Sequence, residues 1–254
     1  MTAWYESTFG RDYLSLYPHR NDEEAIQDIA ALLRLTDLPR REPLLDLCCG
    51  AGRHLAALRR EGFTDLTGLD LSSHLLAEAR ARLDAASMED VQLLRADMRD
   101  IPQRDRFTAI ISLFTSFGYF ASQQEDERVL VSAYRALTRD GTFVLDTLNR
   151  EHVLASLTPS EEKELGDMCV RIRRHISRDG LRVEKETRVT QPGSPVTIYR
   201  ESVRMYAKRE IEDMLGRIGF VNTHFFGSLQ GDAFTNSSAR MVFVTSKVAH
   251  APYH

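Results

Sequence analysis

Residues 44–54 read LLDLCCGAGRH, and this stretch decides how the rest of the chain is interpreted. Residues 44–47 are a short apolar run of the kind that forms a buried strand, and a helix is expected from Arg53. Gly50 and Gly52 lie between them and permit a tight turn. Because glycine has no side chain, such a turn lets a ligand approach the backbone closely. The stretch therefore predicts a strand, a ligand-binding loop and a helix.

The same alternation of strands and helices continues to residue 148. Apolar strands are expected at 44–47, 65–69, 91–94, 107–113 and 142–145, and helices at 53–61, 72–85 and 124–137. Nearly continuous apolar strands separated by helices indicate a parallel sheet covered on both faces. A helix at 208–218 and an antiparallel pair at 221–226 and 241–245 complete it. The predicted fold is α/β, a Rossmann-like doubly wound sheet of seven strands, mostly parallel with the last strand antiparallel.

Two regions do not follow this alternation. Residues 1–40 hold an aromatic stretch and then a helix from about residue 22 to 35, predicted to form an N-terminal helical lid. Residues 151–207 are predicted to form an antiparallel β insert over the active site, because Val170, Ile172 and Ile176 alternate with basic residues before a hairpin turn at 178–180. The cofactor-binding core is then residues 41–150, and residues 208–254 form its end.

Bulk composition narrows the class of protein. The chain has 254 residues, of which 43% are hydrophobic and 28% charged, enough for one globular core. A net charge of −4 gives no general attraction for nucleic acid or anionic membranes. There is no apolar run of about 20 residues to span a membrane, and no signal-peptide core. Three cysteines without paired spacing predict neither a disulfide framework nor a metal site, so we expect a cytoplasmic enzyme. The oligomeric state stays open, a homodimer included.

The glycine loop is a poor cradle for a pyrophosphate. A dinucleotide site needs a third glycine where this chain has Leu55, and its first glycine position is Cys48. The next two strands end in aspartates. Asp70 is placed to accept hydrogen bonds from both hydroxyls of a ribose, and Asp97 to accept one from the amine of an adenine that Met98 covers. An adenosine without a pyrophosphate but with an amino-acid end is S-adenosylmethionine.

These residues resemble the class I S-adenosylmethionine-dependent methyltransferases. The segments 46–52, 69–72 and 96–98 match the family's glycine, ribose and adenine motifs in order, with Cys48 where glycine is commonest. Residues 114–120 resemble the loop after the fourth strand in bacterial members that act on small molecules. The resemblance implies that Gly50 and Gly52 line the methionine end. The further cofactor positions that it implies are Asp46, Cys48, Leu71, Asp70, Asp97, Met98 and Phe114.

The N-terminal segment is the candidate lid over the cofactor. Tyr13 and Tyr17 are four residues apart and would share a helical face, so they could present aromatic rings to the sulfonium, with Arg20 reaching the methionine carboxylate. The alternative is that the tyrosines only fasten the segment to the core. On the acceptor side, Tyr119 is a candidate substrate contact and His152 a candidate base or substrate ligand. His54 is expected to be a surface residue or part of the first helical turn.

The preferred function is methyl transfer by in-line displacement to an N or O atom of a small molecule, such as a specialised metabolite. Most of the rate can come from alignment of the acceptor, worth about 7–11 kcal/mol. Two alternatives keep the fold: an S-adenosylmethionine-binding enzyme of cyclase type that transfers no methyl group, and a regulatory protein. A nicotinamide oxidoreductase is disfavoured by Cys48 and Leu55.

Overall fold

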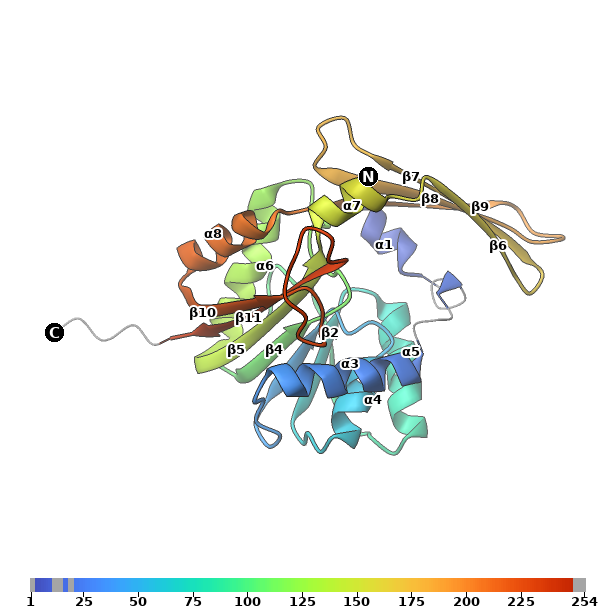
Figure 1. The fold of residues 1–254 in the computed structure, drawn as a ribbon. Helices are drawn as coiled ribbons and strands as arrows, with labels where there is room; N and C mark the ends of the chain where they lie inside the picture. The colour runs from blue at the N-terminus through green and yellow to red at the C-terminus, as the bar shows by residue number, and fades with distance from the viewer. Residues whose placement is uncertain (1–2, 11–15, 18–20, 249–254) are drawn as a thin grey trace.

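The computed structural model describes residues 3–10, 16–17 and 21–248, and these residues form two β-sheets. The larger sheet has seven strands in the order β10-β11-β5-β4-β1-β2-β3 (Figure 1). Its strands are β1 (Leu44–Leu47), β2 (Leu66–Asp70), β3 (Gln92–Arg95), β4 (Phe107–Ser112), β5 (Leu137–Leu148), β10 (Phe220–Phe226) and β11 (Arg240–Lys247). The first five are parallel, and β11 runs antiparallel to both of its neighbours. The predicted fold class is confirmed.

Helices cover both faces of this sheet, because successive strand residues point to opposite sides. Leu44 packs with α3, α4 and α5, whereas Leu45 packs with α6 and α8. The helices on the two faces are α3 (Asp22–Leu35), α4 (Arg53–Arg60), α5 (Ser73–Ala85), α6 (Gln123–Ala136) and α8 (Lys208–Ile218). Polar side chains of Asn21, Ser72 and Ser122 accept hydrogen bonds at the starts of α3, α5 and α6. The doubly wound layers leave the carboxyl ends of β1–β4 at one edge.

The smaller sheet is the insert, which projects over that edge (Figure 1). It has four antiparallel strands in sequence order: β6 (Ser160–Leu165), β7 (Met168–Ile176), β8 (Arg182–Thr190) and β9 (Thr197–Arg204). The turn at 178–180 joins β7 to β8 as predicted. β6 was not expected, because SEEKEL has no alternation of apolar and polar residues and its side chains are largely exposed. It is held by pairing with β7.

Two short helices also differ from expectation. α1 (Trp4–Thr8) lies against β9, and α7 (Arg150–Ser156) follows β5, at a place where no helix was predicted. The side chain of Asn149 caps α7 by accepting from the amide of Glu151. β5 also begins at Leu137, directly after α6, rather than at residue 142.

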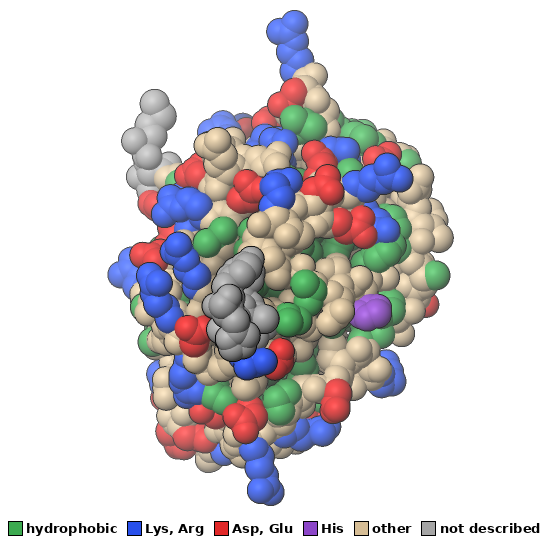
Figure 2. Space-filling view, turned by 90° about the vertical axis from the view of Figure 1, so that its left-hand side faces the viewer, with side chains coloured by type: hydrophobic (Ala, Val, Ile, Leu, Met, Phe, Trp, Pro, Cys, Tyr) green, Lys and Arg blue, Asp and Glu red, His purple; other side chains and the backbone are tan. Residues whose placement is uncertain are grey.

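Surface charges are mixed. On the face seen in Figure 2, acidic and basic side chains are interspersed rather than grouped by sign. Among the described residues, no helix is both long enough and apolar enough to cross a lipid bilayer.

Candidate functional site

A cavity of about 630 Å³ lies at the carboxyl edge of the large sheet. One wall comes from the loops after β1, β2, β3 and β4, and the other from α1 and the residues that follow it. Eight of the residues expected in the site line it: Cys48, Gly50, Asp70, Leu71, Asp97, Met98, Phe114 and Tyr119. A cavity of this size can enclose a ligand as large as a nucleoside with a tail.

The glycine loop has the backbone that its sequence requires. Gly50 and Gly52 have φ angles of +54° and +74°, in the left-handed region that glycine adopts at little cost. A Cβ on Gly52 would lie 3.0 Å from the Cβ of Ala79, so the loop also packs closely on α5. Cys48 shares the left-handed conformation at φ 67°, although it carries a side chain. Its Sγ lies 3.4 Å from Sδ of Met98, the residue that was expected to cover an adenine.

The carboxylate of Asp70 fixes the glycine loop through hydrogen bonds to backbone amides. Its Oδ2 accepts from the amide of Gly50 at 2.9 Å, and its Oδ1 accepts from the amide of Ser72 at 2.9 Å. Burial raises the pKa of this carboxyl, and the two amides oppose the rise. A carboxylate has about four lone-pair positions, so two remain for hydroxyl groups in the cavity. The Gly50 amide, which could otherwise donate to a phosphate, is already used.

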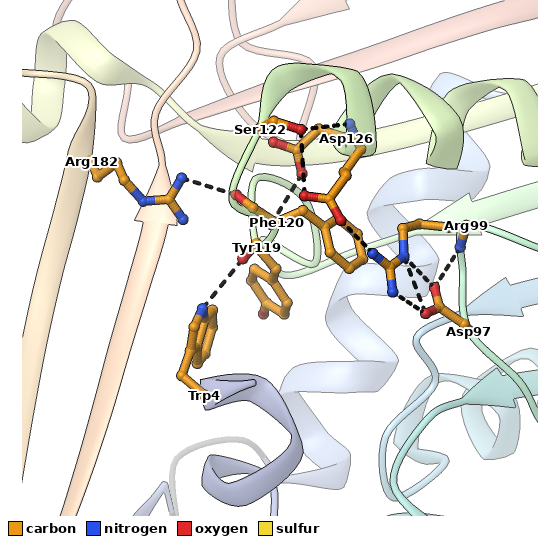
Figure 3. Close-up of polar contacts among 9 residues, drawn as sticks. Trp4, Asp97, Arg99, Tyr119, Phe120, Ser122, Asp126 and Arg182 are labelled. Carbon is orange, nitrogen blue, oxygen red and sulfur yellow. Dashed lines mark hydrogen bonds and ion pairs between the residues drawn. The ribbon is translucent and has the colours of Figure 1, made fainter. Parts of the chain in front are cut away.

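Asp97 is held in place by Arg99 (Figure 3). Nη2 of Arg99 donates to Oδ2 of Asp97 at 2.6 Å, and the Arg99 amide donates to Oδ1 at 2.8 Å. Burial would raise the pKa of Asp97, but the hydrogen bonds and charge of Arg99 outweigh it and lower the pKa. Arg99 also covers the ring of Phe120 at 4.1 Å and pairs with Glu125 at 2.7 Å. The carboxylate is therefore ionised and fixed beside the cavity.

The loop after β4 is strained and tied to β5. Phe114 and Thr115 have φ angles of 60° and 63°, which side-chain-bearing residues rarely adopt. The amide of Phe114 donates to Oδ2 of Asp146 at 3.0 Å, and that of Thr115 to the Asp146 carbonyl at 3.1 Å. Arg240 on β11 pairs with the same carboxylate. These contacts keep the Phe114 ring on the cavity wall.

Aromatic side chains of α1, together with Phe9 directly after it, close the cavity opposite this wall. The ring of Tyr119 stacks on Phe9, with centroids 5.8 Å apart, and meets Trp4 edge-on at 4.9 Å. Tyr5 meets Phe120 edge-on at 5.4 Å. The Phe9 carbonyl accepts from the hydroxyl of Ser72, at the start of α5. The roof that was expected from residues 1–40 is thus formed in part by 4–10.

Several expected site residues lie elsewhere. Asp46 is buried under the loop without lining the cavity, and its Oδ2 has no hydrogen-bond partner among the described residues. Burial raises its pKa to about 6, and His54 opposes the rise. Gly52 is not among the described lining residues, and it packs against Ala79 of α5 beneath the loop. His152 is on α7 and is not among the described lining residues, so its role as a base stays a prediction that the geometry does not favour.

The lid residues divide by position. Tyr13 and Arg20 lie outside the described residues. Tyr17 packs on the insert, where its hydroxyl donates to Oε1 of Glu201 at 3.1 Å and accepts from Lys185. It is not among the described lining residues. These contacts fasten Tyr17 to the insert rather than to the core that the alternative named, and the cofactor contact of Tyr17 stays a prediction.

Of the two positions expected for His54, the first helical turn is confirmed and the surface position is wrong. His54 is in the first turn of α4, only 6% exposed, and it lines the cavity. Its Nε2 lies 3.4 Å from Oδ2 of Asp28 on α3, and its ring packs against Phe114. Asp28 and Phe114 are distant in sequence, so no local pattern reported this burial.

The donor set of the cavity fits S-adenosylmethionine. Asp70 and Asp97 are carboxylates at neighbouring strand ends, spaced by the parallel pairing of β2 and β3. The Gly50 backbone is open to the cavity for a compact amino-acid group, and the aromatic rings that line the cavity could contact a positively charged sulfur. A pyrophosphate fits poorly, because the Asp70 carboxylate occupies the loop amide that would receive it.

Comparison with known proteins agrees with this geometry. Residues 44–141 match the family described as "Methyltransferase domain". The chain is 33% identical over 199 residues to the dTDP-3-amino-3,6-dideoxy-alpha-D-glucopyranose N,N-dimethyltransferase of Streptomyces fradiae, covering 77% of this chain and 72% of that protein. It is 35% identical over 144 residues to the dTDP-3-amino-3,4,6-trideoxy-alpha-D-glucopyranose N,N-dimethyltransferase of Streptomyces venezuelae, covering 56% and 58%.

A solved structure extends the likeness over the whole fold. The crystal structure of DesVI from Streptomyces venezuelae superposes with a TM-score of 0.67 at 25% identity, covering 96% of this chain and 98% of that one. The insert and the N-terminal segment are therefore included in the similarity, not only the core.

Proposed function

The chain belongs to the S-adenosylmethionine-dependent methyltransferases, and from that membership we propose that it methylates the amine nitrogen of a small amino sugar. The support comes from the cavity itself. The side of the cavity at the strand ends, here called the floor, carries the carboxylates of Asp70 and Asp97. The opposite side, here called the roof, consists of residues 4–10 and the insert against which α1 lies. It carries aromatic rings together with the carboxylate of Glu6. Aromatic faces and a carboxylate attract cations, and an amine acceptor is a cation until it loses its proton. Two curated relatives are named as N,N-dimethyltransferases of dTDP-linked amino sugars.

The cofactor supplies an electrophilic methyl group on a positively charged sulfur. This chain's residues bind and orient it. We propose that Asp70 and Leu71 receive the ribose, Asp97 and Met98 the adenine, and Gly50, Cys48 and Phe114 the methionine end. Asp46 and Gly52 then act by supporting the loop. Because alignment is worth far more than proton transfer, the main task of the roof is to hold the nitrogen in line.

Tyr119 is the proposed acceptor contact. Its ring contacts both Trp4 of α1 and Phe9, which follows α1. Its ring can guide the acceptor while water is kept out by Trp4 and Phe9.

A methyl-transfer assay tests this function. The chain is incubated with S-adenosylmethionine labelled in its methyl group and either a nucleotide-linked 3-amino sugar or the matching 3-hydroxy sugar. We expect label on the nitrogen, with one S-adenosylhomocysteine formed per methyl group. Label on the hydroxyl sugar alone, or no S-adenosylhomocysteine with any amine, would overturn the proposal.

Compartment and assembly are also proposals. The cysteines Cys48, Cys49 and Cys169 are free thiols, as is usual in a reducing compartment. We therefore infer a cytoplasmic enzyme. We also infer that its partner is a small molecule rather than nucleic acid. The assembly to test is a homodimer.

A further inference from the structure

Three consecutive carbonyl groups in the loop after β4 accept hydrogen bonds from Trp4 or from the insert, and Figure 3 shows those of Tyr119 and Phe120. The Gly118 carbonyl accepts from the amide of Arg204 at 2.7 Å and from Nη2 of Arg182 at 3.5 Å. The Tyr119 carbonyl accepts from Nε1 of Trp4 at 3.3 Å. The Phe120 carbonyl accepts from Nη1 of Arg182 at 3.0 Å. The guanidinium of Arg182 thus donates hydrogen bonds to the backbone on both sides of Tyr119.

Arg182 is itself held by its own sheet. Its Nε donates to Oγ of Ser202 at 2.8 Å, and its Nη2 donates to the Ser202 carbonyl at 2.6 Å. Burial of the guanidinium lowers its pKa, and the nearby Asp126 opposes that change. The planar fork of arginine can reach two separate carbonyls, whereas lysine offers one nitrogen. Arg182 therefore joins β8 and β9 to the loop as a rigid link.

The loop after β4 and the insert are closely packed at Gly118. Gly118 has a φ of +90°, and a Cβ there would lie 2.3 Å from the Arg204 carbonyl oxygen. On the core side, the Phe120 amide donates to Oδ1 of Asp126 at 3.4 Å. A displacement of β9 or of Arg182 must therefore be transmitted to Tyr119.

We propose that Arg182 is a positioning residue: it sets the place of Tyr119 beside the acceptor through the carbonyls of Gly118 and Phe120. The inference rests on the proposed function, because Tyr119 is taken as the acceptor contact. It assigns the insert a role in turnover rather than in cofactor affinity, since Arg182 does not line the cavity among the described residues.

The test compares Arg182→Gln, Arg182→Lys and a matched control, Arg173→Gln, which changes an exposed arginine of β7 in the same insert. We expect kcat to fall 10- to 100-fold in Arg182→Gln and less in Arg182→Lys, while the Kd for S-adenosylhomocysteine stays within threefold. Arg173→Gln should match the parent. Unchanged kcat in folded Arg182→Gln overturns the proposal, as does an equal loss of S-adenosylhomocysteine affinity.

A second readout does not depend on activity. Trp4 is the only tryptophan in the chain and donates to the Tyr119 carbonyl, so its fluorescence reports the position of the loop. We expect its emission, with S-adenosylhomocysteine bound, to differ between the parent and Arg182→Gln but not between the parent and Arg173→Gln. Identical emission overturns the positioning role, whether or not the parent methylates an amine. If Arg182→Gln does not fold, Ser202→Ala, which removes one anchor of Arg182, should give a smaller change in the same direction.

Discussion

Asp70 and Arg182 hold the two sides of the cavity in different ways. Asp70 accepts from the amides of Gly50 and Ser72, 20 and 2 residues away along the chain. Arg182 donates to the Phe120 carbonyl, 62 residues earlier, and Trp4 reaches the Tyr119 carbonyl across 115 residues. The floor is thus built by neighbouring strand ends of one sheet, and the roof by long-range contacts between separate segments.

This difference separates two functions. The floor carries the groups proposed to bind the cofactor, and the parallel sheet fixes their spacing. The roof contacts the loop that carries Tyr119, and the hydrogen bonds of Trp4 and Arg182 go to that loop rather than to Asp70 or Asp97. Damage to the floor should therefore appear in cofactor affinity, and damage to the roof in turnover.

The largest expected effect comes from the floor. Asp70→Ala removes the proposed ribose acceptor and leaves the Gly50 and Ser72 amides unpaired. We expect the affinity for S-adenosylhomocysteine, measured by calorimetry, to fall 100- to 1000-fold, which is about 3–4 kcal/mol. Asp90→Ala, at an exposed carboxylate, is the control and should bind as the parent does. Equal affinities in the two variants would remove Asp70 from the site.

A roof variant should reverse this pattern. In Gly118→Ala the new Cβ collides with the Arg204 carbonyl, so the loop must shift. We expect kcat to fall about tenfold, or 1.4 kcal/mol, with S-adenosylhomocysteine affinity nearly unchanged. Gly166→Ala is the matched control, because Gly166 also has a positive φ but no atom within 4 Å of the added Cβ. Steady-state kinetics of both variants check this prediction. Equal kcat values in Gly118→Ala and Gly166→Ala would contradict the role given to the roof.

The buried carboxyl behind the loop gives a pH-dependent effect. Burial raises the pKa of Asp126 to about 6, while hydrogen bonds from Tyr206 and Phe120 oppose the rise. Between pH about 4 and 6 the unfolded chain loses this proton and the folded chain keeps it, so the folded state loses stability as pH rises. Above pH 6 the loss is constant, at most about 3 kcal/mol.

Asp126→Asn lacks this loss and can still accept from the Tyr206 hydroxyl. Its Tm relative to the parent should therefore increase from pH 4 to pH 7, by an amount equivalent to about 1–2 kcal/mol. Thermal unfolding at several pH values checks this. A Tm difference that does not change with pH would mean that ionisation of Asp126 does not destabilise the folded state.

The smallest expected effect is at His152. It is on α7 and outside the described cavity lining, so His152→Ala should leave kcat/KM within twofold of the parent across pH 6–8. A large loss of kcat/KM in His152→Ala would restore His152 as the base.

The same contrast explains what could be predicted from sequence. Strand ends, glycine turns and helix caps are local patterns, and they located Asp70, Asp97 and the helix Asp22–Leu35. The residues that were missed depend on distant partners. The burial of His54 needs Asp28, and the role of Arg182 needs the backbone at 118–120; no spacing in the sequence reports either contact. β6 was missed because its residues stay exposed on both faces.

A double-mutant cycle with Asp70→Asn and Arg182→Gln tests the division between floor and roof most directly. For all four proteins, the Kd for S-adenosylhomocysteine and the single-turnover rate at saturating cofactor are measured. We predict that Asp70→Asn alone changes the Kd, that Arg182→Gln alone changes the rate, and that the double variant shows both changes in full, additive within about 0.5 kcal/mol. A coupling above about 1 kcal/mol, or a Kd that follows Arg182, would contradict the account.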